Sequence, residues 1–123
     1  MTEHCSKSIS ERVFKVVSAA AWRAAEQTGS YTGSADDQRD GYIHLSSADQ
    51  LAGTLAKYFR DQADLLLVAF ATGDLGPHLK WEPSRGGILF PHYYGALPTA
   101  AALWQRRLAL GADGIPLVEQ DRL

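Results

Sequence analysis

The sequence predicts one small domain that combines helices and strands, an α/β-type domain. Its 123 residues suffice for a single core and not for two. A β-branched segment at residues 13–17 leads directly into an alanine-rich segment at residues 19–28, and residues 65–71 form an apolar run as long as a buried strand. We place the domain at residues 12–118 and predict flexible polar ends at residues 1–11 and 119–123.

Composition and charge exclude several functional classes. The net charge of −2 has acidic and basic residues interspersed, and only Arg106 and Arg107 make a basic pair, so the sequence predicts no nucleic-acid or anionic-membrane surface. No apolar run is long enough to span a bilayer, and the polar start does not resemble a signal peptide, so we expect a cytoplasmic protein. Cys5 is the only cysteine, which excludes an internal disulfide and a cysteine-based zinc site.

Residue composition and helix-capping residues support the first predicted strand and helix. Residues 13–17, VFKVV, have the composition of a strand, and residues 19 to about 28 have that of a helix. Ser18 is a suitable N-cap, and Gly29 can end the helix in a left-handed conformation. Residues 31–41, YTGSADDQRDG, then predict an irregular loop because Gly, Asp and Ser favour turns.

The middle of the chain predicts a short strand followed by a second helix. Residues 42–46, YIHLS, alternate apolar and polar side chains. The following Ser47 and Gln50 have capping-box spacing, and leucines and a phenylalanine recur every four residues, which predicts a helix over residues 48 to about 60. A histidine, His44, therefore lies just before a helix N-terminus, where unpaired N–H groups can hold an anion.

The second half predicts mainly strands. Residues 65–71, LLLVAFA, are apolar on both faces and predict a central strand, and residues 79–83 and 88–94 predict shorter strands with a turn between them. Residues 99–110 allow two interpretations: their alanine content favours a helix, whereas their place after a proline-containing turn allows a last strand. We assign Trp22 and Trp104 to the core.

Three segments carry the candidate functional residues: residues 40–50, 79–83 and 89–95. They combine histidines, a glutamate and aromatic residues with the Gly and Pro that shape backbone near a ligand, which predicts a pocket. His44 is either a site residue or a hydrogen-bonded structural histidine. Glu82 is either a carboxylate desolvated by aromatic neighbours or a surface residue that pairs with Lys80 or Arg85.

The remaining candidates have equally clear alternatives. His92 either binds a ligand or holds its own loop, and Trp81, Tyr93 and Tyr94 either stack on a planar ring or fill the core. His44, His78, His92 and Glu82 could together be imagined as a metal site. Their spacing matches no helical metal motif, so we predict no metal.

The order of these motifs resembles a known family. Trp22, the loop with Asp37 and Asp40, DGYIHLSSADQ, LKWEP and LFPHYYG follow one another as in the small bacterial domain-of-unknown-function family 952, from about residue 12 to residue 114. That family is similar in fold to the ADP-ribosyltransferases and the RNA 2′-phosphotransferases. The resemblance implies an α+β domain with two small, mostly antiparallel sheets and two helices around a cleft of NAD size.

The resemblance also implies roles for individual residues. His44 would orient a ribose or phosphate, and Glu82 or His92 would complete the catalytic set, with Glu82 stabilising positive charge at the anomeric carbon. Tyr42, Ser46, Trp81 and Tyr94 would contact the nucleotide. Lys15 stands where the superfamily carries a first-strand histidine, a departure from the pattern.

Two functional hypotheses follow. In the first, the protein is an enzyme that acts on NAD, taken as a substrate, or on an ADP-ribose-type phosphate ester. In the second, it is a non-catalytic module that binds a nucleotide or a small anion. The group formed by His44, Glu82 and His92 favours the first hypothesis, and Lys15 in place of a histidine favours the second.

Overall fold

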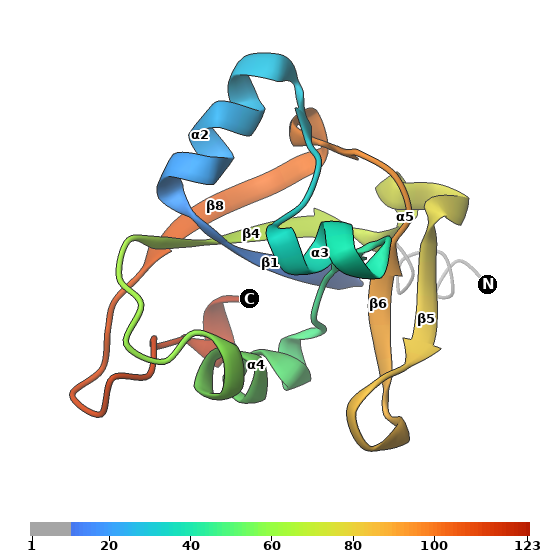
Figure 1. Ribbon diagram of the computed structural model, residues 1–123. Coiled ribbons are helices and arrows are strands. Elements are labelled where there is room, and N and C mark those ends of the chain that lie inside the picture. Colours follow the sequence, from blue (N-terminus) through green and yellow to red (C-terminus); the bar gives the residue numbers. More distant parts are fainter. Residues whose placement is uncertain (1–10) are drawn as a thin grey trace.

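The computed structural model describes residues 11–123, and the expectations for residues 1–10, including Cys5, lie outside that range. Four α-helices occur in the described part of the chain: α2 (Ala19–Thr28), α3 (Ala35–Asp40), α4 (Leu51–Tyr58) and α5 (Thr72–Leu75) (Figure 1). The strands are β1 (Arg12–Ser18), β2 (Ser30–Tyr31), β3 (Ile43–His44), β4 (Leu65–Ala71), β5 (Leu79–Pro83), β6 (Leu89–Tyr93), β7 (Leu97–Pro98) and β8 (Ala102–Leu108). The fold is therefore α+β.

The main sheet has the order β1-β4-β8 and is antiparallel. All seven residues of β4 are buried, which confirms the predicted central strand. Figure 1 shows α2 on one side of this sheet and α4 on the other. Alternate side chains of β1 pack on opposite faces of the sheet. Val13 and Val17 pack with Trp22 of α2, whereas Phe14 and Val16 pack with the leucines of α4.

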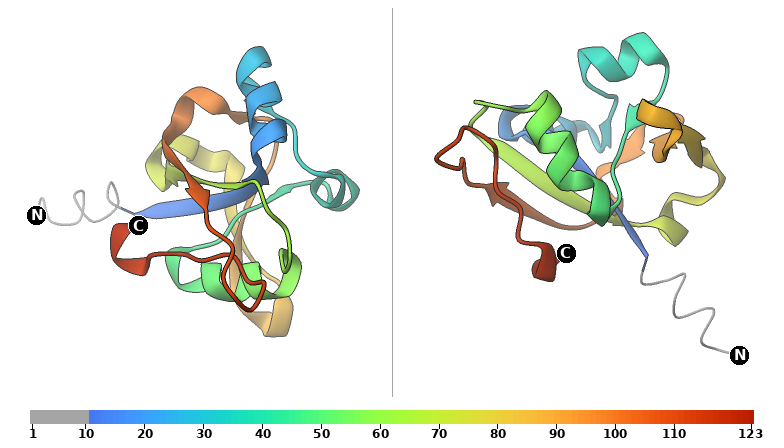
Figure 2. Two further views of the ribbon diagram at one scale, coloured as in Figure 1. Left: turned by 90° about the vertical axis from the view of Figure 1, so that its left-hand side faces the viewer. Right: turned by 90° about the horizontal axis from the view of Figure 1, so that it is seen from below.

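A second antiparallel sheet has the order β3-β6-β5, and β2 pairs with β7 in a separate two-stranded ladder. Figures 1 and 2 show the β5–β6 hairpin at one end of the main sheet. The two larger sheets are joined where Phe14 of β1 and Ser46 exchange backbone hydrogen bonds of 2.8 and 2.9 Å. This junction brings β1 beside β3 and β6, the strands that carry the two histidines of the site.

The helix-capping residues predicted from the sequence form caps in the structure. The hydroxyl of Ser18 accepts a hydrogen bond of 3.1 Å from the N–H of Ala21, and Gly29 ends α2 with a φ of 93°. At the second helix, Ser47 and Gln50 form a capping box, and a short 3₁₀ turn at Ala48–Gln50 precedes α4. The predictions of helices at residues 19–28 and about 48–60 are confirmed.

Three expectations differ from the structure. Residues 31–41 contain helix α3, which begins at the N-cap Ser34, so the structure has more than the two helices expected. The helical interpretation of residues 99–110 is wrong, because Ala102–Leu108 pair with β4 as the third strand of the main sheet after a 3₁₀ turn. Burial against that sheet overrides the helix propensity of the alanines. Trp104 is half-buried against the core beside Phe14.

The C-terminal residues also differ from the loose end that we expected. Gln120–Arg122 form a 3₁₀ turn, and the side chains of Arg12 and Arg106 donate hydrogen bonds of 2.7 and 2.6 Å to the carbonyls of Leu123 and Arg122. The end of the chain is thus held against the edges of the main sheet. Within residues 11–123, no helix is long and apolar enough to cross a membrane.

Candidate functional site

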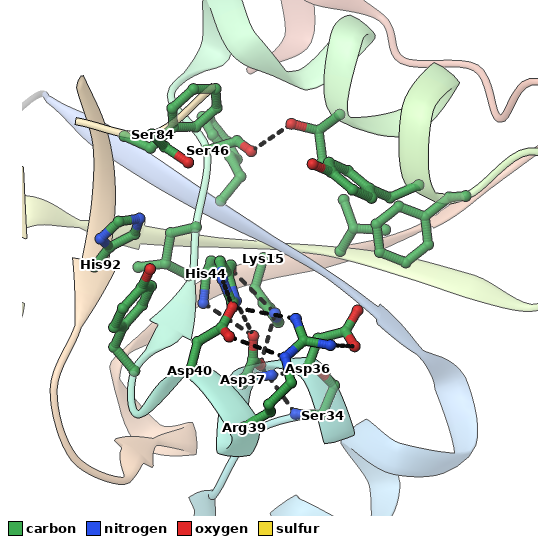
Figure 3. A pocket seen from close by; sticks show the side chains of 18 residues that line it. Lys15, Ser34, Asp36, Asp37, Arg39, Asp40, His44, Ser46, Ser84 and His92 are labelled. Atoms are coloured by element: carbon green, nitrogen blue, oxygen red, sulfur yellow. Dashed lines mark hydrogen bonds and ion pairs between the residues drawn. The ribbon is translucent and has the colours of Figure 1, made fainter. Parts of the chain in front are cut away.

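A cavity of about 250 Å³ lies where β1, α3, β3, α4 and the β5–β6 hairpin meet (Figure 3). It contains four of the residues singled out in the sequence, namely Tyr42, His44, Ser46 and His92. One part of its wall is polar and comes from β1, α3 and β3. The other part is apolar and includes Phe14, Phe59 and Phe90. The arrangement suits a ligand with one polar and one apolar end.

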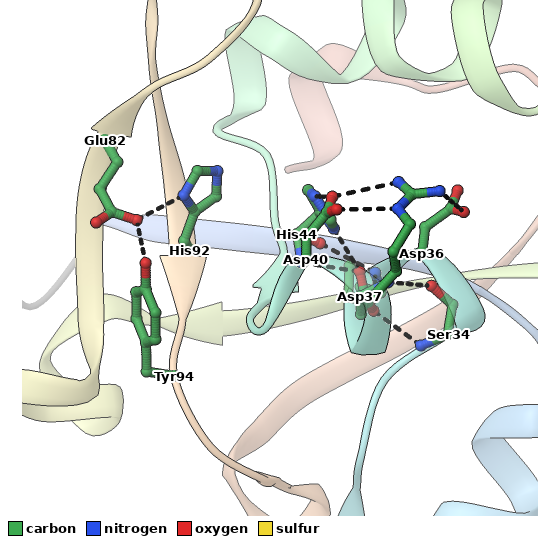
Figure 4. A network of polar contacts seen from close by, with 10 residues as sticks. Ser34, Asp36, Asp37, Asp40, His44, Glu82, His92 and Tyr94 are labelled. Carbon is green, nitrogen blue, oxygen red and sulfur yellow. Dashed lines mark hydrogen bonds and ion pairs between the residues drawn. The ribbon is translucent and has the colours of Figure 1, made fainter.

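His44 lies between two carboxylates of α3. Its Nδ1 is 2.6 Å from Oδ1 of Asp37, and its Nε2 is 2.9 Å from Oδ2 of Asp40 (Figure 4). A neutral imidazole carries one N–H, so both contacts are hydrogen bonds at the same time only when the ring is protonated. The two aspartates therefore leave neither nitrogen of His44 free to take a proton from a ligand.

Asp37 is the buried centre of this cluster, with 2% of its surface exposed. Its second oxygen, Oδ2, accepts hydrogen bonds from Lys15 Nζ and from the N–H of Ser34, both at 2.9 Å. Burial alone would raise the pKa of Asp37, but the bond from His44, the charge of Lys15 and the N–H of Ser34 bring it well below its ordinary value. Asp37 is therefore an ionised, fully bonded carboxylate.

The loop before α3 is shaped to hold Asp37 in place. Ser34 and Asp37 form a capping box in which the hydroxyl of Ser34 accepts a 3.2 Å hydrogen bond from the N–H of Asp37. Gly33 precedes the cap with a φ of 106°, and a Cβ atom at this position would come within 2.8 Å of the Cβ of Asp37. Glycine is thus required where the loop passes the aspartate.

Lys15, on β1, forms the other half of the buried ion pair. Its Nζ also donates a 3.0 Å hydrogen bond to the carbonyl of His44, which ties β1 to β3. Burial lowers the pKa of Lys15, and the charge of Asp37 opposes that shift. Lys15 is therefore engaged in an ion pair and a backbone contact within the protein.

Arg39 completes the charged wall at the surface. Its guanidinium is 3.1 Å from Asp36 and 3.0 Å from Asp40. Asp40 has a pKa below its ordinary value, chiefly because Arg39 donates hydrogen bonds to it. Among the described residues that line the cavity, each basic side chain of this wall faces a carboxylate.

His92 has a different environment. Its Nδ1 lies 2.8 Å from Oε1 of Glu82, and the hydroxyl of Tyr94 donates a 2.7 Å hydrogen bond to the same oxygen (Figure 4). These bonds from His92 and Tyr94 lower the pKa of Glu82. An ionised carboxylate can only accept, so Nδ1 carries the proton, and Nε2 of the neutral ring is left as an acceptor. Within residues 11–123, Nε2 has no hydrogen-bond partner.

Tyr42 contacts both histidines, whose rings also meet each other edge to face at 5.8 Å. Its ring stacks on that of His92, with centroids 4.0 Å apart and planes inclined by 23°, and it meets the ring of His44 at 4.9 Å. The resemblance implies that Tyr42 contacts the nucleotide. In the structure its ring is already occupied by the histidines, and it fixes the ring of His92 beside the cavity.

The remaining predicted residues lie in three places. Ser46 is in the cavity, where its hydroxyl is 2.9 Å from that of Thr54 on α4. Glu82 and Tyr94 lie behind His92. Trp81 alternates with Glu82 along β5 and lines a separate shallow hollow beside Arg12. The structure therefore brings His44, His92, Tyr42 and Ser46 together in the cavity and places Trp81 outside it.

Sequence reasoning missed Asp37 and Asp40 as site residues because we interpreted their segment as an irregular loop. The signal that could have found them is the Ser34-x-x-Asp37 spacing of a capping box, followed by a left-handed glycine at Gly41. Once this segment is a helix, its acidic side chains lie together at the start of β3. In the described part of the chain, no group of three or more potential ligands is arranged to hold a metal ion.

Comparisons with known proteins agree with the motifs. The sequence model of a family described as "Protein of unknown function (DUF952)" matches residues 16–105. The crystal structure of protein CC0527 from Caulobacter crescentus is similar, with 46% identity, a TM-score of 0.84, and coverage of 86% of this chain and 93% of that chain. The solution NMR structure of CC0527 covers 91% of this chain and 96% of its own, with 46% identity and a TM-score of 0.81. A comparison with curated proteins finds no match.

Proposed function

This chain belongs to the DUF952 family of proteins of unknown function, and we propose that it is an enzyme that cleaves a bond to the ribose of NAD or of an ADP-ribose-type ester. The observation that carries the proposal is the pair formed by Glu82 and His92. In this pair a carboxylate holds Nδ1 of the histidine at 2.8 Å, while Nε2 faces the cavity and has no hydrogen-bond partner among residues 11–123. A histidine held in this way is the arrangement of a general base.

The cavity fits part of a nucleotide better than a whole dinucleotide. Its volume of about 250 Å³ lies below the range of roughly 300–1,000 Å³ that is usual for pockets of drug-sized ligands. Each basic side chain of the α3 wall is already paired with a carboxylate in the described part of the protein. We therefore place a base and its ribose in the cavity and the phosphates outside it.

The chemistry that these groups support is a displacement at the anomeric carbon of the ribose. The bond from C1′ to the nicotinamide nitrogen breaks, and the electron pair leaves with the neutral nicotinamide. The carboxylate of Asp40, on the cavity wall, stabilises positive charge that develops on the ribose. A water or acceptor hydroxyl forms the new C1′–O bond, and Nε2 of His92 takes its proton.

Glu82 has a different task from the one that the resemblance implies. It contacts His92 and Tyr94 and is not part of the cavity wall. We therefore assign it a positioning role: it keeps the proton on Nδ1 of His92 and the basic nitrogen toward the substrate. The carboxylate that meets the ribose in this proposal is Asp40.

A second candidate function is that of a binding module without catalysis. The observation that favours it is Lys15, which is 6% exposed and bonded to Asp37 and to the carbonyl of His44. A cation that is engaged in this way does not replace a histidine that orients a ribose. In this alternative the cavity holds a nucleotide through His44 and Ser46, and no bond is broken.

One experiment separates the two functions. The ¹⁵N-labelled protein is mixed with NAD, and amide shifts and nicotinamide release are followed in one tube. We expect shifts around the cavity together with nicotinamide release. The variant Glu82→Gln should lose at least about a hundred-fold in rate while it keeps the shifts, and Glu26→Gln, on the exposed surface of α2, should retain full activity.

The other outcomes decide against the enzyme. Shifts with intact NAD that disappear in His44→Ala would identify a binding module. The same titration with ADP-ribose and with inorganic phosphate shows which part of the nucleotide is bound. If Glu82→Gln were as active as the wild type, the role of His92 as the base would be wrong.

A further inference from the structure

One oxygen of the Glu82 carboxylate accepts hydrogen bonds from two donors. Nδ1 of His92 lies 2.8 Å from Oε1, and the hydroxyl of Tyr94 lies 2.7 Å from the same atom. Tyr94 directly follows β6, and its N–H donates a 2.9 Å hydrogen bond to the carbonyl of His78, so the backbone there is fixed. Lys80 lies over the Tyr94 ring, 5.7 Å from its centroid. The hydroxyl is therefore aimed at Glu82 by the surrounding structure.

Sharing one oxygen has a consequence for the histidine. Negative charge that is partly neutralised by the O–H of Tyr94 is less able to stabilise a proton on His92. The phenol remains a donor over the physiological range, since the hydrogen bond to Glu82 raises the pKa of Tyr94. Tyr94 thus weakens the hydrogen bond between Glu82 and Nδ1 of His92 by sharing its acceptor oxygen.

We propose that Tyr94 is a positioning residue that moderates the basicity of His92 through Oε1 of Glu82. Its catalytic meaning rests on the proposed function, whereas its effect on the ring of His92 does not. A general base works best when it is neutral at the working pH. Without the hydroxyl of Tyr94, Nδ1 of His92 would not share Oε1 of Glu82, and its hydrogen bond to that oxygen would be stronger.

Several charged, titratable and aromatic groups face His92, and the test must separate the effect of Tyr94 from theirs. They come from β5, from the residue after β6, from the residue before β3 and from β3 itself, and they are Glu82, Lys80, Tyr94, Tyr42 and His44. The informative substitution is Tyr94→Phe, which removes the hydroxyl and keeps the ring under Lys80. Tyr93→Phe is the matched control, because it removes a hydroxyl from the neighbouring residue on the strand.

The first measurement uses the protein without any ligand. The ring nitrogens and the Nδ1 proton of His92 are observed by ¹⁵N and ¹H NMR. We expect the wild type to carry its proton on Nδ1. In Tyr94→Phe this proton should move downfield, because its hydrogen bond to Glu82 strengthens, and in Glu82→Gln it should move upfield or the proton should transfer in part to Nε2. Tyr93→Phe should match the wild type.

The second measurement is the pH dependence of nicotinamide release from NAD. The acid limb of the profile should move to higher pH in Tyr94→Phe, by roughly half a unit to one unit, and should not move in Tyr93→Phe. A Tyr94→Phe protein whose His92 resonances and acid limb equal those of the control would overturn the role of Tyr94. If the resonances respond but NAD is not cleaved, Tyr94 keeps its effect on His92 and the proposed function fails.

Discussion

The two histidines of the site show that exposure and chemical availability are different properties. The side chain of His44 is 36% exposed, yet both of its nitrogens are taken up by Asp37 and Asp40. The side chain of His92 is only 3% exposed, yet while Glu82 holds one of its nitrogens, the other lies toward the cavity with no partner in the described part of the chain. For a base, the unpaired nitrogen matters more than the accessible area of the ring.

The two clusters also differ in what holds them. The cluster of His44 is built on a buried ion pair, between Lys15 and Asp37, that ties α3, β1 and β3 together. The cluster of His92 is built on a half-exposed carboxylate at the edge of the second sheet. We therefore expect the first cluster to be needed mainly for stability and the second mainly for chemistry. Substitutions in each cluster test this difference in role.

The largest effect is expected from Asp37→Asn. The substitution leaves the ammonium of Lys15 buried without a counter-charge and leaves one acceptor oxygen where two now accept from Lys15, Ser34 and His44. Loss of one partner of a buried pair typically costs about 3 to 5 kcal/mol, a large part of the unfolding free energy of a small domain. Urea titration followed by circular dichroism measures the change.

Asp36→Asn is the matched control for Asp37→Asn. It makes the same change one residue earlier in α3, where the side chain is 70% exposed, and its unfolding midpoint should equal that of the wild type. Replacing the pair together, as Lys15→Met with Asp37→Leu, should recover much of the lost stability because no charge is then buried. If Asp37→Asn unfolds at the wild-type midpoint, the ion pair does not support the fold.

The next largest effect is on acid sensitivity. The pKa of Asp37 is lower in the folded protein than in the unfolded chain, mainly through His44 and Lys15 acting against burial. Between the two values the unfolded state binds more protons, so the contribution of Asp37 to stability is complete above the unfolded pKa of roughly 3.9 and is lost as the pH falls below it. Urea titrations at pH 6 and pH 3 should show a smaller loss in Asp37→Asn than in the wild type.

Local signals in the sequence predict much of this fold. The caps of α2 and α4 and the apolar run of β4 are each contained in a few consecutive residues, and all three predictions are confirmed. Helix α3 was missed because its only apolar residue is Ala35, so it has no hydrophobic periodicity. What stabilises α3 is the contact of Asp37 with Lys15, which is 22 residues away along the chain.

Part of the candidate site could also be predicted from the sequence. The three segments do supply His44 and His92, because histidine is less often fully buried than the aliphatic residues that fill a core. Which face of β5 meets His92 depends on its register with β6, which pairs Glu82 with Phe90 and Trp81 with Pro91. That register is set by packing between distant segments, so the sequence alone could not separate Glu82 from Trp81.

The smallest effect on stability is expected from Glu82→Gln. This variant tests most directly whether the His44 and His92 clusters differ in role. The side chain is 34% exposed, and glutamine keeps a carbonyl that can accept from the N–H of His92 and the O–H of Tyr94. The urea midpoint should therefore stay close to that of the wild type and far above that of Asp37→Asn. Equal losses in the two variants would mean that both clusters serve mainly to hold the fold. A stable Glu82→Gln protein with altered His92 resonances would place the chemistry of this cavity at the β5–β6 hairpin.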